Sequence, residues 1–204
     1  MGGPKLPEQE RCDAILAAAY QIALTEGLDA VTARRVATAA GISPGLVFFH
    51  FQSKDGLLQA LLDVLLNGTL DALSDPALAA LAPWDRLERM IRVELERLTE
   101  YHAGVELLFG FYFARRDGVF RDRIEGSFGR YLEAFLPVCR EVAGAAGTDA
   151  AGGARGVSGD DLAATVVALI QGASIQAIRK PASVNPEALL ATIRALRPQP
   201  AQRP

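Results

Sequence analysis

Residue types that often mark reactive chemistry are scarce in this sequence. Its 204 residues include two cysteines and two histidines, and aromatic residues make up 7% of the chain. Cys12 and Cys139 cannot form a disulfide framework, so we expect two free thiols in a reducing compartment. His50 and His102 are too few to build a multi-histidine metal centre within one chain. The sequence therefore predicts no metal site and no cofactor.

The motifs that carry common enzymatic reactions are also missing. The sequence contains no glycine-rich phosphate loop, no Gly-x-Ser-x-Gly elbow and no paired-carboxylate helix motif of the di-iron type. We therefore expect a protein that is not an enzyme. The net charge of the whole chain is −3, which does not favour binding to nucleic acid. Any contact with DNA therefore has to come from a local basic patch.

Long hydrophobic runs of the secretory or membrane kind are lacking as well. The N-terminal stretch MGGPKLPEQERC holds no apolar segment typical of a secretory signal. The longest apolar run, residues 162–178, is interrupted by Thr165, Gln171 and Gln176 and is short for a membrane span. We expect a buried helix there and a cytoplasmic protein.

Helix-forming residues with helical spacing are abundant instead. The chain has 35 alanines, and apolar residues recur every three or four positions in nearly every segment, which predicts an all-α chain. We expect a flexible linker at residues 144–159, where six of sixteen residues are glycine, and a frayed tail at 198–204. The expected helices are 8–26, 33–40, a short one from Pro44, 54–70, one from Trp84, 104–116, 118–143, 162–178 and 186–196.

Residues 32–51 form the most informative segment. Thr32 is a suitable N-cap for a short helix that Gly41 would end, and Ser43 is a suitable N-cap for the next helix. This pattern predicts a helix-turn-helix, whose second helix presents its first residues to a DNA major groove. An ordinary helical corner gives the same pattern and remains an alternative. The side chains expected to allow a close crossing and to fill the corner are Val36, Ala37, Ala40, Ile42 and Val47.

The segment TARRVATAAGISPGLVFFHFQSKDGLL, residues 32–58, resembles the N-terminal region of the TetR family of bacterial transcriptional regulators. The shared features are a threonine at the helix start, a small-residue turn, a glycine in the recognition helix, an aromatic cluster and a Ser-Lys pair before two leucines. These features are Thr32, Gly41, Gly45, Phe48, Phe49, His50, Phe51, Ser53, Lys54, Leu57 and Leu58.

This resemblance implies a domain organisation as well as a function. It implies a three-helix helix-turn-helix domain at residues 8–68, followed by a helical effector-binding and dimerisation domain at residues 69–197. The later segment ALIQGASIQAIRKPASVNPEALLATIRAL is similar to the subgroup of the family that includes the choline-responsive repressor of the betaine pathway. That second similarity says little about the ligand of this chain.

The expected DNA contacts begin with phosphates. The resemblance implies that Thr32 and Lys54 each contact a phosphate. Arg34 and Arg35 lie in the first turn of a helix, where positive charge opposes the helix dipole, so a phosphate partner explains them better than stability does.

The second helix of the motif carries the expected base contacts. Phe48 departs from the usual tyrosine of the family and lacks its hydroxyl, which makes it a candidate core residue. Leu46 stands where the family more usually has Thr, Ser or Ala, and its apolar side chain can meet a thymine methyl but cannot donate to a base. The complete set of expected DNA-binding residues is Thr32, Arg34, Arg35, Ser43, Pro44, Gly45, Leu46, Phe49, His50 and Lys54.

The resemblance further implies a homodimer that reads a palindromic double-stranded operator. Its half-sites would be about 34–36 Å apart or slightly more. The helices at 118–143 and 160–180 would pair with their symmetry mates into a four-helix bundle. The small residues expected to permit close approach are Ala168, Gly172, Ala173 and Ala177.

An effector site is expected among the aromatic residues of the segment 84–135. Those residues either fill the core or line a cavity, and Gly104 and Gly110 would leave room for the cavity. We expect a small, largely hydrophobic effector, either aromatic or carrying a cation that Glu106 meets. The expected effector-binding residues are Trp84, Tyr101, His102, Glu106, Phe109, Tyr112, Phe113, Phe128 and Tyr131.

Two functions from different classes follow from this sequence. The first is a ligand-responsive DNA-binding regulator, in its simplest form a repressor. The second is a helical small-molecule-binding dimer whose helix-turn-helix no longer binds DNA. A gel shift with the DNA upstream of its own gene separates the two.

Overall fold

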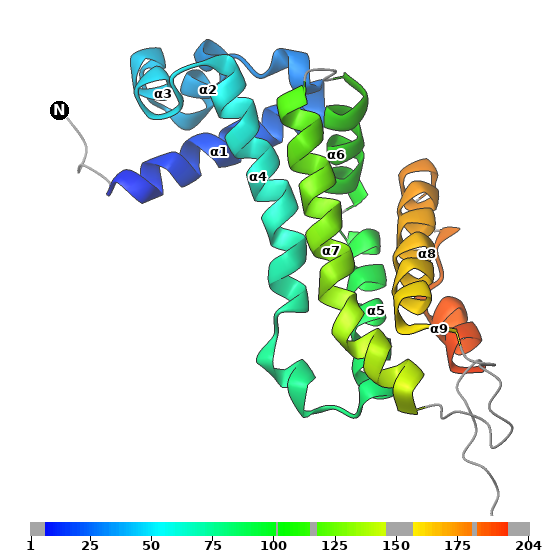
Figure 1. Ribbon diagram of the computed structural model, residues 1–204. Coiled ribbons are helices and arrows are strands. Elements are labelled where there is room, and N and C mark those ends of the chain that lie inside the picture. The colour runs from blue at the N-terminus through cyan, green and yellow to red at the C-terminus, as the bar shows by residue number, and fades with distance from the viewer. Residues whose placement is uncertain (1–6, 101, 115–117, 146–156, 181–182, 196–204) are drawn as a thin grey trace, which may run out of the picture. The chain divides into compact units, whose positions relative to one another are not determined.

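The computed structural model describes residues 7–100, 102–114, 118–145, 157–180 and 183–195, and all secondary structure within these ranges is helical (Figure 1). The all-α prediction is therefore confirmed. The α-helices are α1 (Glu8–Glu26), α2 (Ala33–Ala40), α3 (Pro44–Phe51), α4 (Lys54–Leu73), α5 (Pro83–Glu100), α6 (His102–Ala114), α7 (Gly118–Ala145), α8 (Gly159–Arg179) and α9 (Pro186–Ala195), and the 3-10 helices are η1 (Leu28–Ala30) and η2 (Pro76–Ala80).

The linker predicted at residues 144–159 is shorter than expected on both sides. Gly144 belongs to α7, which continues through Pro137, and Gly159 begins α8. Residues 146–156 of the predicted linker and the predicted tail lie outside the described residues.

The chain divides into two compact units. One unit combines the residues up to 67 with residues 106–124, and the other combines residues 68–105 with the residues from 125 onward. The N-terminal unit therefore includes much of α6 and the start of α7, whereas the sequence analysis placed every residue from 69 to 197 in one domain.

The core of the N-terminal unit is built from aliphatic faces with one aromatic pair. Phe111 of α6 and Phe120 of α7 are fully buried, and their rings stack 5.7 Å apart. Leucines of α4, including Leu57, Leu58 and Leu61, are buried in the same cluster. Apolar area removed from water is the main stabilising contribution of such a cluster.

The second unit has a core formed mainly by α5, α7 and α8. Leu87, Ile91 and Leu95 of α5 are fully buried, as is Phe135 of α7. Cys139 is buried in this core, and its burial raises the pKa of the thiol to about 11, so it is an inert packing residue.

One face of α8 remains exposed although the helix is strongly apolar. By length and composition it is the one helix in the described ranges that is apolar enough to cross a membrane, with 33% of its most apolar stretch buried. Ala173 and Ala177 are buried within the unit, so they are not available to a symmetry mate as the sequence analysis expected. Ala168 and Ile175 lie on the exposed face.

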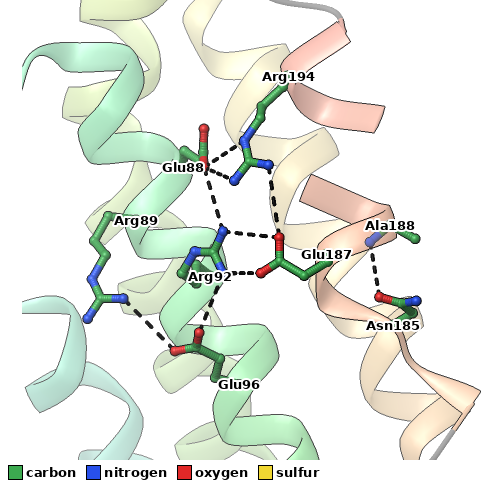
Figure 2. Close-up of polar contacts among 8 residues, drawn as sticks. All are labelled: Glu88, Arg89, Arg92, Glu96, Asn185, Glu187, Ala188 and Arg194. Atoms are coloured by element: carbon green, nitrogen blue, oxygen red, sulfur yellow. Dashed lines mark hydrogen bonds and ion pairs between the residues drawn. The ribbon is translucent and has the colours of Figure 1, made fainter. Parts of the chain in front are cut away.

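A network of charges joins α9 to α5 (Figure 2). Arg92 of α5 pairs with Glu187 of α9 and lies 3.9 Å from Glu88 and 3.7 Å from Glu96. Arg194 of α9 donates from Nε to Oε1 of Glu88 at 2.9 Å. The network fixes α9 against α5 beside the apolar contact of Leu190, which is fully buried.

Replacing Arg92 by methionine is expected to lower the melting temperature at neutral pH and low salt by a few degrees. The loss is modest because the ion pairs are partly exposed, and it should shrink as salt rises. Arg92 holds the pKa of Glu187 below its ordinary value of 4.5. A depressed folded-state pKa means that this stabilisation is present above about pH 4.5 and is lost as pH falls through the depressed value.

Thermal unfolding followed by circular dichroism across pH and salt checks this expectation. The matched control is Arg89→Met on the same helix, because Arg89 reaches only Glu96 at 4.0 Å among the described residues. Equal losses for the two variants would contradict the role given to Arg92.

Candidate DNA-binding site

Two short helices of the N-terminal unit, α2 and α3, cross through a tight turn (Figure 1). Val36, Ala37 and Val47 are buried where the helices meet, as the sequence predicted. Gly41 ends α2 with φ +67°, and the N–H of Ile42 donates to the carbonyl of Ala37 at 2.9 Å. The positive φ favours glycine, so the turn depends on this residue.

The caps of the motif agree with the sequence analysis at one end and differ at the other. The hydroxyl of Thr32 accepts a hydrogen bond from the N–H of Arg35 at 3.3 Å, as a threonine N-cap should. Ser43 stands at the N-cap position of α3 as predicted, but its side chain makes no capping hydrogen bond. Pro44 begins α3 with a φ that its ring fixes near the helical value, and it has no N–H group that would need a capping acceptor.

The outer face of α3 is apolar and open. Phe49 is 73% exposed and Phe48 is 51% exposed, so the suggestion that Phe48 is a core residue is wrong. Gly45 and Pro44 are exposed in the first turn of the same helix, where a Cβ on Gly45 would meet only Ser43 Oγ at 4.0 Å. Large exposed aromatic side chains beside a glycine, which lets a partner approach the backbone closely, are typical of a binding surface.

Three basic residues lie near the starts of α2 and α4. Arg34 is exposed, and its guanidinium makes no hydrogen bond or ion pair with any residue that the structure describes. Arg35 forms an ion pair with Glu26 of α1, and Lys54 donates from Nζ to the carbonyl of Asp29 at 3.1 Å. Arg34 is therefore the most available of the three cations for an anionic partner.

The connection from α3 to α4 is closely packed. Gln52 has φ +63°, and the hydroxyl of Ser53 accepts from the N–H of Gly56 at 2.9 Å, so Ser53 caps α4 as predicted. A Cβ built on Gly56 would overlap the carbonyl oxygen of Phe51. This packing fixes how α3 is presented by the rest of the unit.

Sequence reasoning missed a contact between Cys12 and His50. Cys12 Sγ lies 3.4 Å from His50 Nδ1, so α1 holds the last turn of α3 through a thiol–imidazole contact. Burial raises the pKa of Cys12, and the charges of Glu8 and Asp13 raise it further, so the thiol stays protonated and unreactive. The two residues are 38 positions apart, and nothing in their local spacing indicated the contact.

The expected effector residues fall into both units, and each group is described within its own unit. In the N-terminal unit, Phe109 and Phe113 stack at 6.1 Å, Tyr112 packs edge-on against Phe113, and Glu106 is exposed. Phe113 is 68% exposed, so it is not a core residue.

In the second unit, Tyr131 is buried, Trp84 is partly buried against the core and Phe128 is 38% exposed. Tyr101 and the side chain of His102 lie outside the described residues. The effector site remains a prediction.

A shallow groove of about 540 Å³ lies between α1 and α2 of the N-terminal unit. It is lined mainly by alanines, including Ala14, Ala18 and Ala40. The groove contains none of the residues expected to bind an effector, and it lies on helices other than α3.

The helix-turn-helix has relatives among known proteins. Residues 15–61 match the family of bacterial regulatory proteins described as the tetR family. Over 86 residues the chain is 36% identical to the HTH-type transcriptional regulator BetI of Rhizobium meliloti, which is 42% of this chain and 42% of that protein. Over 104 residues it is 29% identical to the HTH-type transcriptional repressor KstR2 of Mycolicibacterium smegmatis, which is 50% of this chain and 51% of that protein.

The chain thus spans about half the length of the curated relatives it matches. Both relatives are transcriptional regulators and not enzymes, in agreement with the sequence analysis.

Solved structures share the fold over most of the chain. A TetR transcription regulator from Haloarcula marismortui superposes with a TM-score of 0.74 at 21% identity, over 93% of this chain and 97% of that one. A transcriptional regulator from Saccharomonospora viridis, solved in complex with choline, superposes with a TM-score of 0.72 at 19% identity, over 93% of this chain and 96% of that one. At these identities the likeness shows the fold alone.

Proposed function

Residues 15–61 match the tetR family of bacterial regulatory proteins, and from that premise we propose that the chain is a TetR-family repressor released from its operator by a small, largely hydrophobic effector. The observation that carries the DNA-binding part is the outward face of α3, with its exposed Phe48 and Phe49 beside the open Gly45. An apolar face of this kind meets thymine methyl groups and sugars in a major groove.

Phosphate contacts on either side of α3 would set its orientation in the groove. Arg34 has no competing ion pair within the described residues, and Thr32 lies at the same helix start. Lys54 would exchange its bond to the Asp29 carbonyl for a phosphate oxygen. Contacts of this type position the protein, while the α3 side chains specify the sequence.

The exposed apolar face of α8 supports a homodimer. Ala164, Ala168, Gly172 and Ile175 recur at four, four and three positions, so they lie on one side of the helix away from its buried residues. Pairing with the same face of a second copy removes this surface from water and permits close approach over the small residues. Burial in a dimer interface would account for the apolar composition of α8 without a membrane, in keeping with the proposed cytoplasmic regulator.

We assign DNA binding to residues 8–68 and effector binding with dimerisation to residues 69–197. The effector would contact aromatic residues of the second unit, such as Trp84, Phe128 and Tyr131, and α4 would carry the response because it is continuous from residue 54 to residue 73. Release requires that the effector binds more tightly to a conformation whose recognition helices are wrongly spaced for DNA.

Replacing Arg34 by alanine is expected to weaken DNA binding and to flatten its salt dependence. Each lost phosphate contact should reduce the slope of log affinity against log salt by about 1, hence by about 2 for a dimer. Fluorescence anisotropy with the DNA upstream of the gene, measured over a range of salt, gives both quantities. The control is Arg130→Ala, an exposed arginine of α7 in the second unit. An unchanged slope for Arg34→Ala would remove this residue from the interface.

Replacing Ile175 by arginine is expected to convert the dimer to a folded monomer that has lost most of its operator affinity. Ile175 is 51% exposed in the unit, so the change leaves the core intact while placing a charge in the proposed interface. Sedimentation velocity measures the oligomeric state, and the gel shift measures DNA binding. Val64→Arg on α4 is the matched control, because Val64 is also 51% exposed. A variant that sediments as the wild type does would place the dimer interface elsewhere.

A further inference from the structure

An acidic side chain lies in the core-facing stripe of α5. Glu94 is three residues after Ile91 and four before Leu98, positions that a helix places on one face. Ile91 is fully buried, Leu98 is 6% exposed and Glu94 is itself only 5% exposed. A carboxylate among aliphatic side chains is costly to bury, so its partners decide whether it can be charged.

One oxygen of Glu94 has a partner and the other does not. The hydroxyl of Tyr131 on α7 donates to Glu94 Oε2 at 2.9 Å. Glu94 Oε1 is buried and makes no hydrogen bond with any residue in the described ranges. Burial raises the pKa of Glu94, against the opposing effects of the Tyr131 hydrogen bond and the charge of Arg97.

The surroundings combine this acceptor with apolar and hydroxyl groups. Tyr131 packs edge-on against the fully buried Phe135, with ring centroids 5.4 Å apart. Ser127 lies one turn before Tyr131 on α7 and is 7% exposed, so a second buried hydroxyl belongs to the same helical face. All of these residues belong to the second unit.

We propose that Glu94 and Tyr131 anchor a protonated amine, whose N–H group donates to Glu94 Oε1 and whose apolar body packs on the surrounding side chains. A carboxylate only accepts hydrogen bonds, and a buried one requires a cation to offset its charge. A primary or secondary ammonium supplies both the donor and the charge, whereas a neutral alcohol supplies only a donor and a quaternary ammonium supplies only the charge. This inference rests on the proposed function as a ligand-responsive regulator and narrows the chemical class of its effector.

The experiment compares amines with alcohols of the same carbon skeleton. Isothermal titration calorimetry with the full chain uses 2-phenylethylamine against 2-phenylethanol and n-hexylamine against n-hexanol. The wild type should bind each amine about tenfold or more tightly than the matching alcohol, because the alcohol can donate to Glu94 Oε1 but brings no positive charge to offset the buried carboxylate. In Glu94→Gln this preference should disappear while the affinity for the alcohol is kept.

Two further variants keep the result interpretable. Glu133→Gln removes an exposed carboxylate from α7 and should retain the preference for amines. Tyr131→Phe removes the donor to Oε2 and should change the affinity for amines more than the affinity for alcohols, which provides a second measurement if Glu94→Gln does not fold. No binding of either amine to the wild type, or an unchanged preference in Glu94→Gln, would overturn the site and leave Glu94 as a protonated or water-bonded core residue.

A gel shift with the same compounds separates this inference from the proposed function. An amine that binds through Glu94 without weakening DNA binding supports the site and contradicts its role as an effector site. Release from DNA by the alcohols alone, with no amine bound, supports the proposed function and overturns the site.

Discussion

The close crossing of α2 and α3 is the constraint on which the DNA-binding surface depends. Val36, Ala37 and Val47 are small enough to let the two helices meet, and Gly41 provides the positive φ of the turn between them. Val47 of α3 is buried at this crossing, while Phe48 and Phe49 of the same helix are exposed. Turning Val47 toward α2 turns the next two residues of the helix outward, because successive helical side chains point in different directions.

Contacts from outside the motif fix its orientation. Cys12 of α1 touches His50 at the end of α3, and Gly56 lies against the Phe51 carbonyl where α4 begins. Together with the packing against α2, these contacts hold α3, whose eight residues would form only a marginal helix on their own. A rigidly held recognition helix can read DNA at a lower entropic cost than a mobile one.

The second unit has polar groups both on its surface and inside its core. Its surface charges join α5 to α9 in an exposed network, while Glu94 and Tyr131 place an acceptor and a hydroxyl inside an otherwise aliphatic core. Exposed pairs contribute modestly to stability, whereas a buried acceptor with an unfilled oxygen costs stability. This cost is consistent with the proposal that Glu94 serves to bind a ligand.

Local chemistry made much of the fold predictable from the sequence. Helical periodicity, the Thr32 cap and the Gly41 terminus placed α2 at the residues where the structure has it, because each signal acts within one turn. Contacts between distant residues were not predictable in this way. The Cys12–His50 contact depends on the crossing of α1 with α3, and the packing of residues 106–124 with the N-terminal unit depends on tertiary contacts.

Glu94 is an intermediate case. The sequence analysis did not single it out, although its place among Leu87, Ile91, Leu95 and Leu98 puts an acidic residue on an apolar helix face, and the hydrogen bond from Tyr131 depends on a contact between helices. Phe48 shows the opposite error, since an apolar residue type suggested burial where the structure has exposure. Residue type alone therefore predicts burial poorly on a surface that binds a partner.

Selection of binding sites from a random double-stranded DNA library tests the central claim most directly. The account predicts enrichment of a two-fold symmetric sequence whose half-sites lie about one helical turn or slightly more apart, with both half-sites protected in the major groove. Failure to enrich any sequence, or enrichment of a single asymmetric site bound by one copy of the chain, would contradict it.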